Sequence, residues 1–353
     1  MPNENEVPLD LYPESVLRRF TTDFVLALGA TSEEAEIVAS GLTTASLWWH
    51  PGQGQGLEKL FRYHRRVGNG GIVPGARMEW VKDGPSHALL DAGKGFGYVA
   101  AHRAMARAID KARNNIIAVV GVRNSNHFGI AGYHALQAAQ AGMIGWAMTN
   151  AGSEMAPTGS AKPVLGTNPW GISIPRPNHP PMVLDMALTA SGKGMIRWLH
   201  LAGMPMPENW ALTEEGRRTT DPAEAMSGPL LPIGDYKGYG LSLVTDVLTG
   251  VMTGALFGLS VFQQDTNFDV GHLMLAVRPD AFLDRSIFED RLEKLIEEVR
   301  AAPPIEPDHP VLLPGELEYR RMEERRRNGV PVFHETVERL SELALELEIE
   351  PLS

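Results

Sequence analysis

The stretch IIAVVGVRNSNHFG, residues 116–129, indicates both the kind of fold and a candidate site. Residues 116–122 are rich in β-branched side chains and free of polar ones, which is typical of a strand buried on both faces. His127 follows among small polar residues, and ligands of open α/β sheets gather beyond the carboxyl ends of strands. An imidazole titrates near neutral pH, so His127 is a candidate proton donor or acceptor. A structural histidine bonded to a backbone carbonyl fits the position equally well.

Around this stretch, short apolar runs alternate with amphipathic or Ala-rich segments. This alternation predicts an α/β fold with a largely parallel or mixed sheet. Thr31 and the acids after it read as a helix cap. The expected strands cover residues 88–90, 116–122, 144–149, 183–186 and 272–277, and the expected helices cover residues 13–28, 32–47, 57–67, 99–114, 130–141, 239–253, 288–300, 314–327 and 335–348.

Composition excludes several classes of protein. The 353 residues contain no cysteine, which removes disulfides, thiolate nucleophiles, cysteine-based zinc sites and iron–sulfur clusters, and is compatible with the cytoplasm. The net charge of −11 argues against a general nucleic-acid binder. Residues 1–11 lack the features of a secretory signal. Residues 238–259 are the most apolar long stretch, but their polar side chains predict a buried helix and no membrane span.

The common nucleotide and hydrolase signatures are absent from the sequence. It contains no Walker loop and no G-x-G-x-x-G after a strand, so a standard Rossmann site is not expected. It also lacks the G-x-S-x-G and H-E-x-x-H motifs, and no metal site is predicted.

Three further segments offer suitable chemistry. The turn LGTNPWG, residues 165–171, presents backbone N–H groups and short polar side chains, as a phosphate or amide cradle would, although a plain turn is the simpler interpretation. Lys237 in GDYKGYG, residues 234–240, precedes an apolar helix, where an anion site and a solvated lysine are both consistent with the pattern. Asp185 ends an apolar strand, where it would orient a catalytic group or cap the next turn.

Taken together and in order, these motifs resemble the malate/L-lactate dehydrogenase family that is unrelated to the Rossmann-type enzymes of the same names. The resemblance runs from about residue 12 to residue 320 and includes SNHFG (125–129), LGTNP (165–169), LDMA (184–187), WAL (210–212), TDP (220–222), YKGYG (236–240), GH (271–272) and LPGE (313–316). It implies a family-specific, non-Rossmann α/β fold with helices on both faces of the sheet and helical N- and C-terminal regions. It also implies a homodimer, and hydride transfer between NAD or NADP and a small-molecule substrate, without nucleic acid or membrane partners.

The resemblance also assigns roles to residues. Nucleotide contacts of the family fall on Gly166, Thr167, Asn168 and Pro169, on Lys237 and Gly238, and on Pro314, Gly315 and Glu316. His127 corresponds to a histidine that acts as acid or base in some members, with Asp185 orienting the site. Lys59, Tyr63 and His272 are the expected substrate contacts.

One segment departs from the family pattern. The family usually carries Asp-Ser-His-Gly, then an Arg and, four residues later, a Tyr. Here residues 50–59 read HPGQGQGLEK, and Tyr63 lies four residues after Lys59. Gln55, or Gln53 in a second alignment, replaces the histidine, and Lys59 replaces the arginine; His50 compensates only if the loop is rebuilt. Glutamine donates a hydrogen bond to a carbonyl but transfers no proton, which leaves His127 as the proton carrier.

The sequence therefore supports three hypotheses on one fold. The first is an oxidoreductase that interconverts a small 2-hydroxy acid and a 2-keto acid. The second is a reductase of a cyclic imino acid, in which Gln55 or Gln53 only positions the substrate. The third is a nucleotide-binding member that has lost catalysis. We expect three parts: residues 1–75, helical; residues 76–285, the nucleotide-binding and catalytic α/β domain; and residues 286–353, helical and packed on the first.

Overall fold

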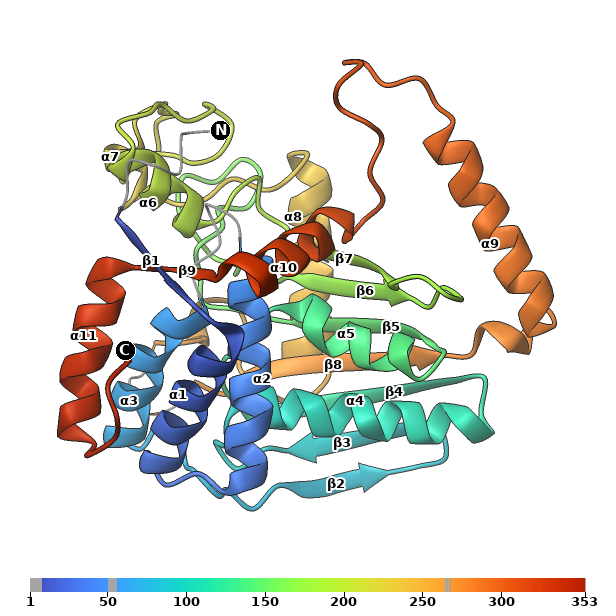
Figure 1. Cartoon of the computed structure of the whole chain (residues 1–353), viewed down its shortest axis with the longest axis horizontal. Helices are drawn as coiled ribbons and strands as arrows, with labels where there is room; N and C mark the ends of the chain where they lie inside the picture. Colours follow the sequence, from blue (N-terminus) through green and yellow to red (C-terminus); the bar gives the residue numbers. More distant parts are fainter. Residues whose placement is uncertain (1–7, 50–55, 264–265, 267, 353) are drawn as a thin grey trace.

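A seven-stranded mixed sheet forms the centre of the protein, as seen in the computed structural model, which describes residues 8–49, 56–263, 266 and 268–352 (Figure 1). Its order is β2-β3-β4-β8-β5-β6-β7. The strands are β2 (Glu79–Asp83), β3 (His87–Asp91), β4 (Ile117–Ser125), β5 (Ile144–Thr149), β6 (Trp170–Ile174), β7 (Met182–Met186) and β8 (Val270–Val277). The expectation of an α/β fold with a mixed sheet is confirmed. The sheet is not largely parallel, because among its strands only β3 and β4 pair in parallel.

Helices cover both faces of this sheet. On one face, α4 (Gly97–Asn114) and α5 (Ala131–Gln140) pack on the strands at close range. Glycines on the strands allow that approach, since a Cβ at Gly145 would stand 2.3 Å from the carbonyl oxygen of Ala135 in α5. On the other face, α8 (Tyr236–Asp246) continues as a π-helical turn (Val247–Val251) that packs on β4 and β8.

The two ends of the chain build a second, helical region together. It contains β1 (Leu9–Tyr12), α1 (Glu14–Ala27), α2 (Ser32–Trp48) and α3 (Lys59–Gly68) from the N-terminal part, with α10 (Glu316–Asn328), β9 (Val330–Phe333) and α11 (His334–Glu346) from the C-terminal part. β1 and β9 pair antiparallel, with Leu9 opposite Phe333. The expected cap of α2 is confirmed: Thr31 Oγ1 accepts from the Glu34 amide and Glu34 Oε2 accepts from the Thr31 amide.

The remaining helices are α6 (Lys193–Leu201), α7 (Pro222–Ala225) and α9 (Arg285–Arg300), with short 3₁₀ turns at Gly56–Glu58, Gly258–Ser260 and Pro279–Ala281. In Figure 1, α9 projects to one side of the sheet as an arm. Arg176, between β6 and β7, forms a two-bond ion pair with Glu293 on this arm. The three-part division at residues 75 and 285 remains a prediction.

The apolar helix expected from residues 239–253 exists, but the prediction that it is buried is wrong. Its polar residues face inward: Ser242, Thr245 and Thr249 are completely buried. Many apolar side chains instead face outward, and the exposed ones are Tyr236, Leu241, Leu243, Val244, Val247, Val251 and Met252. The inward side stays polar because the hydroxyl groups bond to the preceding turn and to the loop before β6. Among the described residues, no helix combines the length and hydropathy that a bilayer crossing requires.

Arg325 on α10 ties the C-terminal part to the end of α2. Its Nη1 donates to the carbonyl oxygens of Ser46, Leu47 and Trp49, at 3.1, 2.9 and 2.5 Å, and the residue is 8% exposed. The last carbonyl groups of a helix have no intrahelical donor, so this guanidinium satisfies the buried carbonyl groups of Ser46 and Leu47 in the last turn of α2.

We expect Arg325→Leu to lower the free energy of unfolding by about 2–4 kcal/mol, because it strands these carbonyl groups in a buried site. Denaturant unfolding measures the difference. The neighbouring Arg326→Leu is the matched control, since Arg326 pairs with Glu14 at the surface and its loss should cost less than about 1 kcal/mol. Equal losses in the two variants would contradict the role given to Arg325.

Candidate active site

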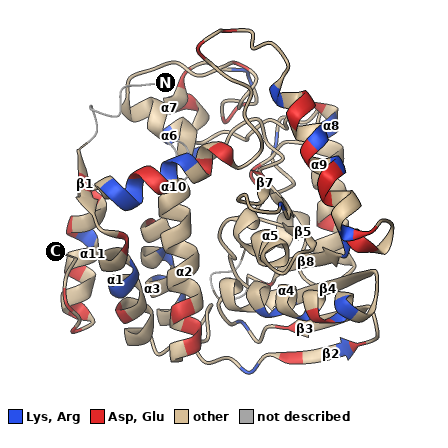
Figure 2. Ribbon diagram, turned by 45° about the vertical axis from the view of Figure 1, so that its right-hand side comes forward, with Lys and Arg blue, Asp and Glu red and all other residues tan. Residues whose placement is uncertain are grey.

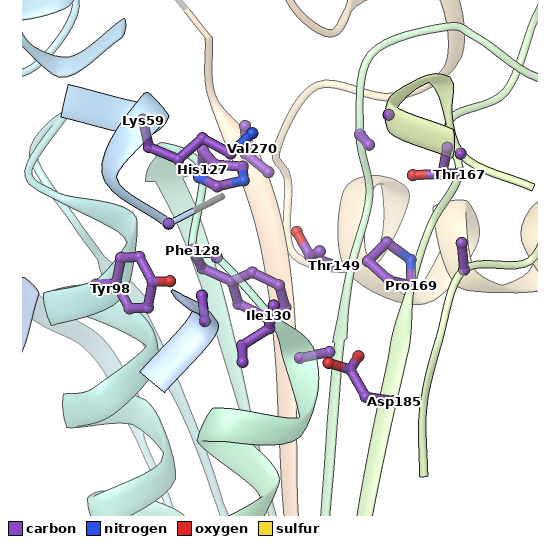
Figure 3. Close-up of a pocket in the computed structure, with 18 of the residues that line it drawn as sticks. Lys59, Tyr98, His127, Phe128, Ile130, Thr149, Thr167, Pro169, Asp185 and Val270 are labelled. Atoms are coloured by element: carbon purple, nitrogen blue, oxygen red, sulfur yellow. The ribbon is translucent and has the colours of Figure 1, made fainter. Parts of the chain in front are cut away.

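The sheet topology brings several loops to one edge, where they enclose a cavity of about 320 Å³ (Figure 3). Because β8 pairs antiparallel with both β4 and β5, the carboxyl ends of β4 and β5 lie at the same edge. The ends of β7 and the start of β6 lie there too. The wall consists of Lys59 and Gly56 from the helical region, residues 127–131, 149–151, 185–187, Thr167, Pro169, Gly192, Gly194 and Phe262, together with further apolar side chains.

His127 reaches this cavity because β4 is irregular at its end. The register of β4 against β8 shifts between Val122 and Ser125, and Asn124 adopts a positive φ of 52°. Such bulges redirect a strand, here toward the cavity. Tyr63 Oη lies 3.3 Å from His127 Nδ1. Burial and the nearby positive charges of Lys59 and Arg62 hold the pKa of His127 well below its usual range, so the imidazole is neutral at physiological pH.

Lys59 lies beside His127 on the same wall (Figure 3). It is the first residue of α3 and directly follows the 3₁₀ turn at Gly56–Glu58. Burial and the charge of Arg62 lower the pKa of Lys59, while Glu58 and Glu154 act in the opposite direction. A cation beside a neutral imidazole is suited to an anionic substrate group. Tyr63, expected as a substrate contact, is buried behind His127 and is not part of the wall.

Asp185 lies on the opposite side of the cavity, at the end of β7 (Figure 3). Burial raises the pKa of Asp185 to about 7, although the backbone N–H groups of Gly132 and Ala131 donate to its carboxyl group and act the other way. Those two groups belong to the first turn of α5, so Asp185 interacts with the N-terminus of this helix. Its protonation therefore changes near neutral pH within the wall of the cavity.

The four residues of the turn at 166–169 have two different roles. Thr167 and Pro169 line the cavity, whereas Gly166 and Asn168 hold the turn in place. Asn168 Oδ1 accepts from the Ala151 amide at 2.9 Å, and Asn168 Nδ2 donates to the Ser242 carbonyl on α8 at 3.0 Å. Asn168 has a positive φ of 38°. The amide side chain thus fixes this turn between the end of β5 and α8.

Other expected site residues lie away from the cavity wall. Lys237 is exposed in the first turn of α8, where Gly238 donates its N–H to the Ile233 carbonyl. Pro314 and Glu316 line a separate cleft of about 200 Å³, together with Arg176, Arg300 and Arg320. Gly315 precedes α10 with a positive φ of 87°, and Pro314 accepts from the Val183 amide on β7, two residues from Asp185.

His272 is completely buried within β8, between Ser125 Oγ at 2.9 Å and Thr149 Oγ1 at 2.7 Å. It does not line the cavity. Gln55, with Gln53 and His50, lies outside the described residues. Within the described part of the chain, no three His, Asp or Glu side chains form a group that could hold a metal ion.

Two parts of the wall were not predicted. The segment after β5, residues 149–151, contributes Thr149 and Asn150. The N-terminus of α6 contributes Gly192 and Gly194, and its cap residue Gly192 has no side chain that could cap the first turn. The Gly-Lys-Gly pattern at residues 192–194, just before an amphipathic segment, was a signal that would have indicated this site.

Comparisons with known proteins show the family of the chain. A family model described as malate/L-lactate dehydrogenase matches residues 12–341. A malate dehydrogenase of Pyrococcus abyssi is 36% identical over 341 residues, covering 94% of this chain and 93% of its own. An L-sulfolactate dehydrogenase of Methanothermobacter thermautotrophicus is also 36% identical, covering 93% of this chain and 94% of its own.

Solved structures show the same fold. The malate dehydrogenase structure from Pyrococcus horikoshii superposes with a TM-score of 0.88 at 33% identity, covering 99% of this chain and 98% of its own. The sulfolactate dehydrogenase structure from Methanocaldococcus jannaschii superposes with a TM-score of 0.89 at 32% identity, covering 97% and 98%. The resemblance noted in the sequence is thereby confirmed, and the chain belongs to the malate/L-lactate dehydrogenase family.

Proposed function

We propose that the protein is an NAD(P)-dependent oxidoreductase that interconverts a small 2-hydroxy acid and the corresponding 2-keto acid. The observation that carries the proposal is the placement of His127 and Lys59 side by side in one cavity of about 320 Å³. This volume lies in the range of sites that hold small molecules. The named relatives, malate and sulfolactate dehydrogenases, act on acids of this class.

The cavity has groups that fit a nicotinamide cofactor. The N-terminus of α6 offers backbone N–H groups at Gly192–Gly194, which suit a phosphate. Thr167 adds a hydroxyl, and Asp185 adds an acceptor for hydroxyl or amide groups. The residues that we propose to hold the cofactor are therefore Thr167, Asp185 and the start of α6, together with Pro314–Glu316 beyond β7. When bound, the nicotinamide supplies or accepts the hydride.

We assign the proton transfer of the reaction to His127. Its neutral imidazole accepts the hydroxyl proton when the 2-hydroxy acid is oxidised and returns it to the carbonyl oxygen in the reverse direction. Tyr63 contacts Nδ1, so Nε2 is the nitrogen left for the substrate. Lys59 would hold the carboxylate as a point charge, without the two-pronged geometry of an arginine, and carboxylate recognition is correspondingly less directional.

We also propose that the protein is a homodimer that buries α8. Beyond Lys237 in its first turn, the exposed large side chains of α8 and of the π-helical turn after it are apolar, so this side leaves an apolar surface in water. Val244 and Val247, 52% and 46% exposed, lie on this side. A second copy of the chain would cover this surface with an equivalent one, as the two-fold symmetry of most oligomers requires.

Replacing His127 tests the proposed reaction. His127→Gln keeps hydrogen bonding but removes proton transfer, so we expect kcat to fall by about 10²- to 10⁴-fold. Turnover of pyruvate, oxaloacetate, 3-sulfopyruvate and cyclic imino acids with NADH and NADPH measures it, and quenching of tryptophan fluorescence measures cofactor binding, which should persist.

His87→Gln is the matched control, because His87 is exposed at the start of β3, which runs parallel to β4, and so lies away from the edge of the sheet that carries the cavity. Turnover that persists in His127→Gln would contradict the role of His127. Cofactor binding without turnover of any compound would favour a member that has lost catalysis, and turnover of cyclic imino acids alone would favour the reductase.

The raised pKa of Asp185 predicts that the stability of the folded protein depends on pH. Its pKa is about 7 in the folded protein and about 3.9 in an unfolded chain, so the folded state binds this proton more tightly. The resulting stabilisation is present at low pH and is lost as the pH rises through about 7. Asp185→Asn does not titrate, so its stability relative to the wild type should increase from pH 5 to pH 8. Thermal unfolding at both values measures this, and a constant difference would contradict it.

Charges on α8 test the homodimer. Val244→Asp combined with Val247→Asp places two charges on the proposed interface, and we expect sedimentation to show a monomer where the wild type shows a dimer. Leu345→Asp on α11 is the control, since this residue is 70% exposed on a different helix and its substitution should leave the dimer intact. A doubly charged variant that still sediments as a dimer would place the interface elsewhere.

A further inference from the structure

The end of β4 contains one residue more than the strand beside it. Val122 pairs with His272 and Ser125 pairs with Val270, so three steps along β4 correspond to two along β8. Asn124 absorbs the extra length with its positive φ of 52°. An irregularity of this kind leaves local groups unpaired and changes the direction of the chain. The loop that carries His127 begins directly after it.

His272 lies on β8 directly beside this irregularity, opposite Val122. It is completely buried, with Nε2 2.9 Å from Ser125 Oγ and Nδ1 2.7 Å from Thr149 Oγ1. These hydroxyl groups are at the ends of β4 and β5, the two strands that flank β8. One imidazole thus joins three neighbouring strands at the edge of the sheet where the cavity lies.

The same imidazole supports the cavity wall from behind. The Phe128 ring stacks on His272 with the centroids 4.8 Å apart and the planes 11° from parallel. Phe128 follows His127 in the chain and lines the cavity, as Figure 3 shows. The backbone between Ser125 and Phe128, which includes His127, is therefore held at both ends by contacts with His272.

Both ring nitrogens of His272 have hydrogen-bond partners. Thr149 Oγ1, which contacts Nδ1, also lies 2.9 Å from the Asn150 carbonyl oxygen and 3.0 Å from the Gly271 carbonyl oxygen. Ser125 Oγ contacts Nε2, and the backbone of Asn126 and Gly271 also hydrogen-bonds to the ring. Burial lowers the pKa of His272 to about 3, so the ring is neutral.

We propose that His272 is a positioning residue for the oxidoreduction: it holds the irregular end of β4 so that His127 faces the substrate, and it does not contact the substrate itself. The assignment rests on the proposed function, in which His127 carries the proton. It replaces the expectation that His272 is a substrate contact. Because His272 acts through His127, its loss should impair proton transfer more than substrate or cofactor binding.

Nuclear magnetic resonance of the histidine rings tests the geometry without turnover. In ¹⁵N-labelled wild-type protein, the signals that disappear in His272→Leu identify His272. We expect them to show a neutral ring that does not titrate down to pH 5.5. We also expect the His127 signals to move in Ser125→Ala, which removes only the hydroxyl that contacts Nε2. A charged His272, or unmoved His127 signals, would overturn the proposal.

Steady-state kinetics test the consequence, with the keto acid that the wild type reduces fastest. We expect His272→Leu to lower kcat by about 10- to 100-fold and Ser125→Ala by about 3- to 10-fold, with KM and the Kd of NADH within about 3-fold of the wild type. His272→Gln, whose amide oxygen can accept from Ser125, should recover part of the loss. Ser125→Ala removes so few atoms that it keeps the test usable if His272→Leu does not fold.

A double-mutant cycle separates positioning from a general structural role. In the His127→Gln background, His272→Leu should change the residual kcat by less than about 2-fold, since the group through which it acts is gone. An undiminished further loss, or a rise in KM at constant kcat, would overturn the proposal. If His127→Gln itself retained full kcat, the proposed function would fail, whereas a wild-type kcat in His272→Leu beside an impaired His127→Gln would reject the positioning role alone.

Discussion

The pairing of β8 with both β4 and β5 is the interaction on which the rest of the structure depends. A strand inserted antiparallel between two others gives those two the same direction, so their carboxyl ends meet at one edge. The loops after them then supply His127, Thr149 and their neighbours to the same cavity. This sheet thereby places the candidate site beyond strand ends, as parallel nucleotide-binding sheets do, although only β3 and β4 of its strands pair in parallel.

Local signals in the sequence were sufficient for most of the helices and for the inner strands. The capping pattern at Thr31 and the β-branched run before His127 were interpreted correctly, because each depends on residues close in the chain. Strands β1, β2, β6 and β9 were not predicted. β1 and β9 have four residues each and pair with each other, so no signal in the local sequence distinguishes them from a loop. The direction of β8 was also beyond reach, since a strand's partners lie far away in the sequence.

The burial of α8 was also mispredicted. Its apolar sequence predicts a helix inside the chain, but the apolar side chains face outward, where a second copy of the chain would cover them in the proposed dimer. In the site, the local sequence indicated His127 and Asp185, while Lys59 gained its role from the resemblance to the family. Thr149 became visible only when the fold brought it to the cavity, and the Gly-Lys-Gly pattern at residues 192–194 was a local signal that was not used. Charges were less informative, because basic and acidic residues alternate along α10, as Figure 2 shows.

The pairing of β1 with β9 has a consequence for the order in which the protein is made. Leu9 pairs with Phe333, and Arg325 closes the end of α2, so the helical region near the start of the chain is completed by residues near its end. Contacts between such distant residues form slowly, since a long loop must close first. During synthesis, α1 to α3 emerge from the ribosome long before their partners. The apolar sides of these helices then stay without their C-terminal partners until the last elements are translated, so this region completes its packing only at the end of synthesis.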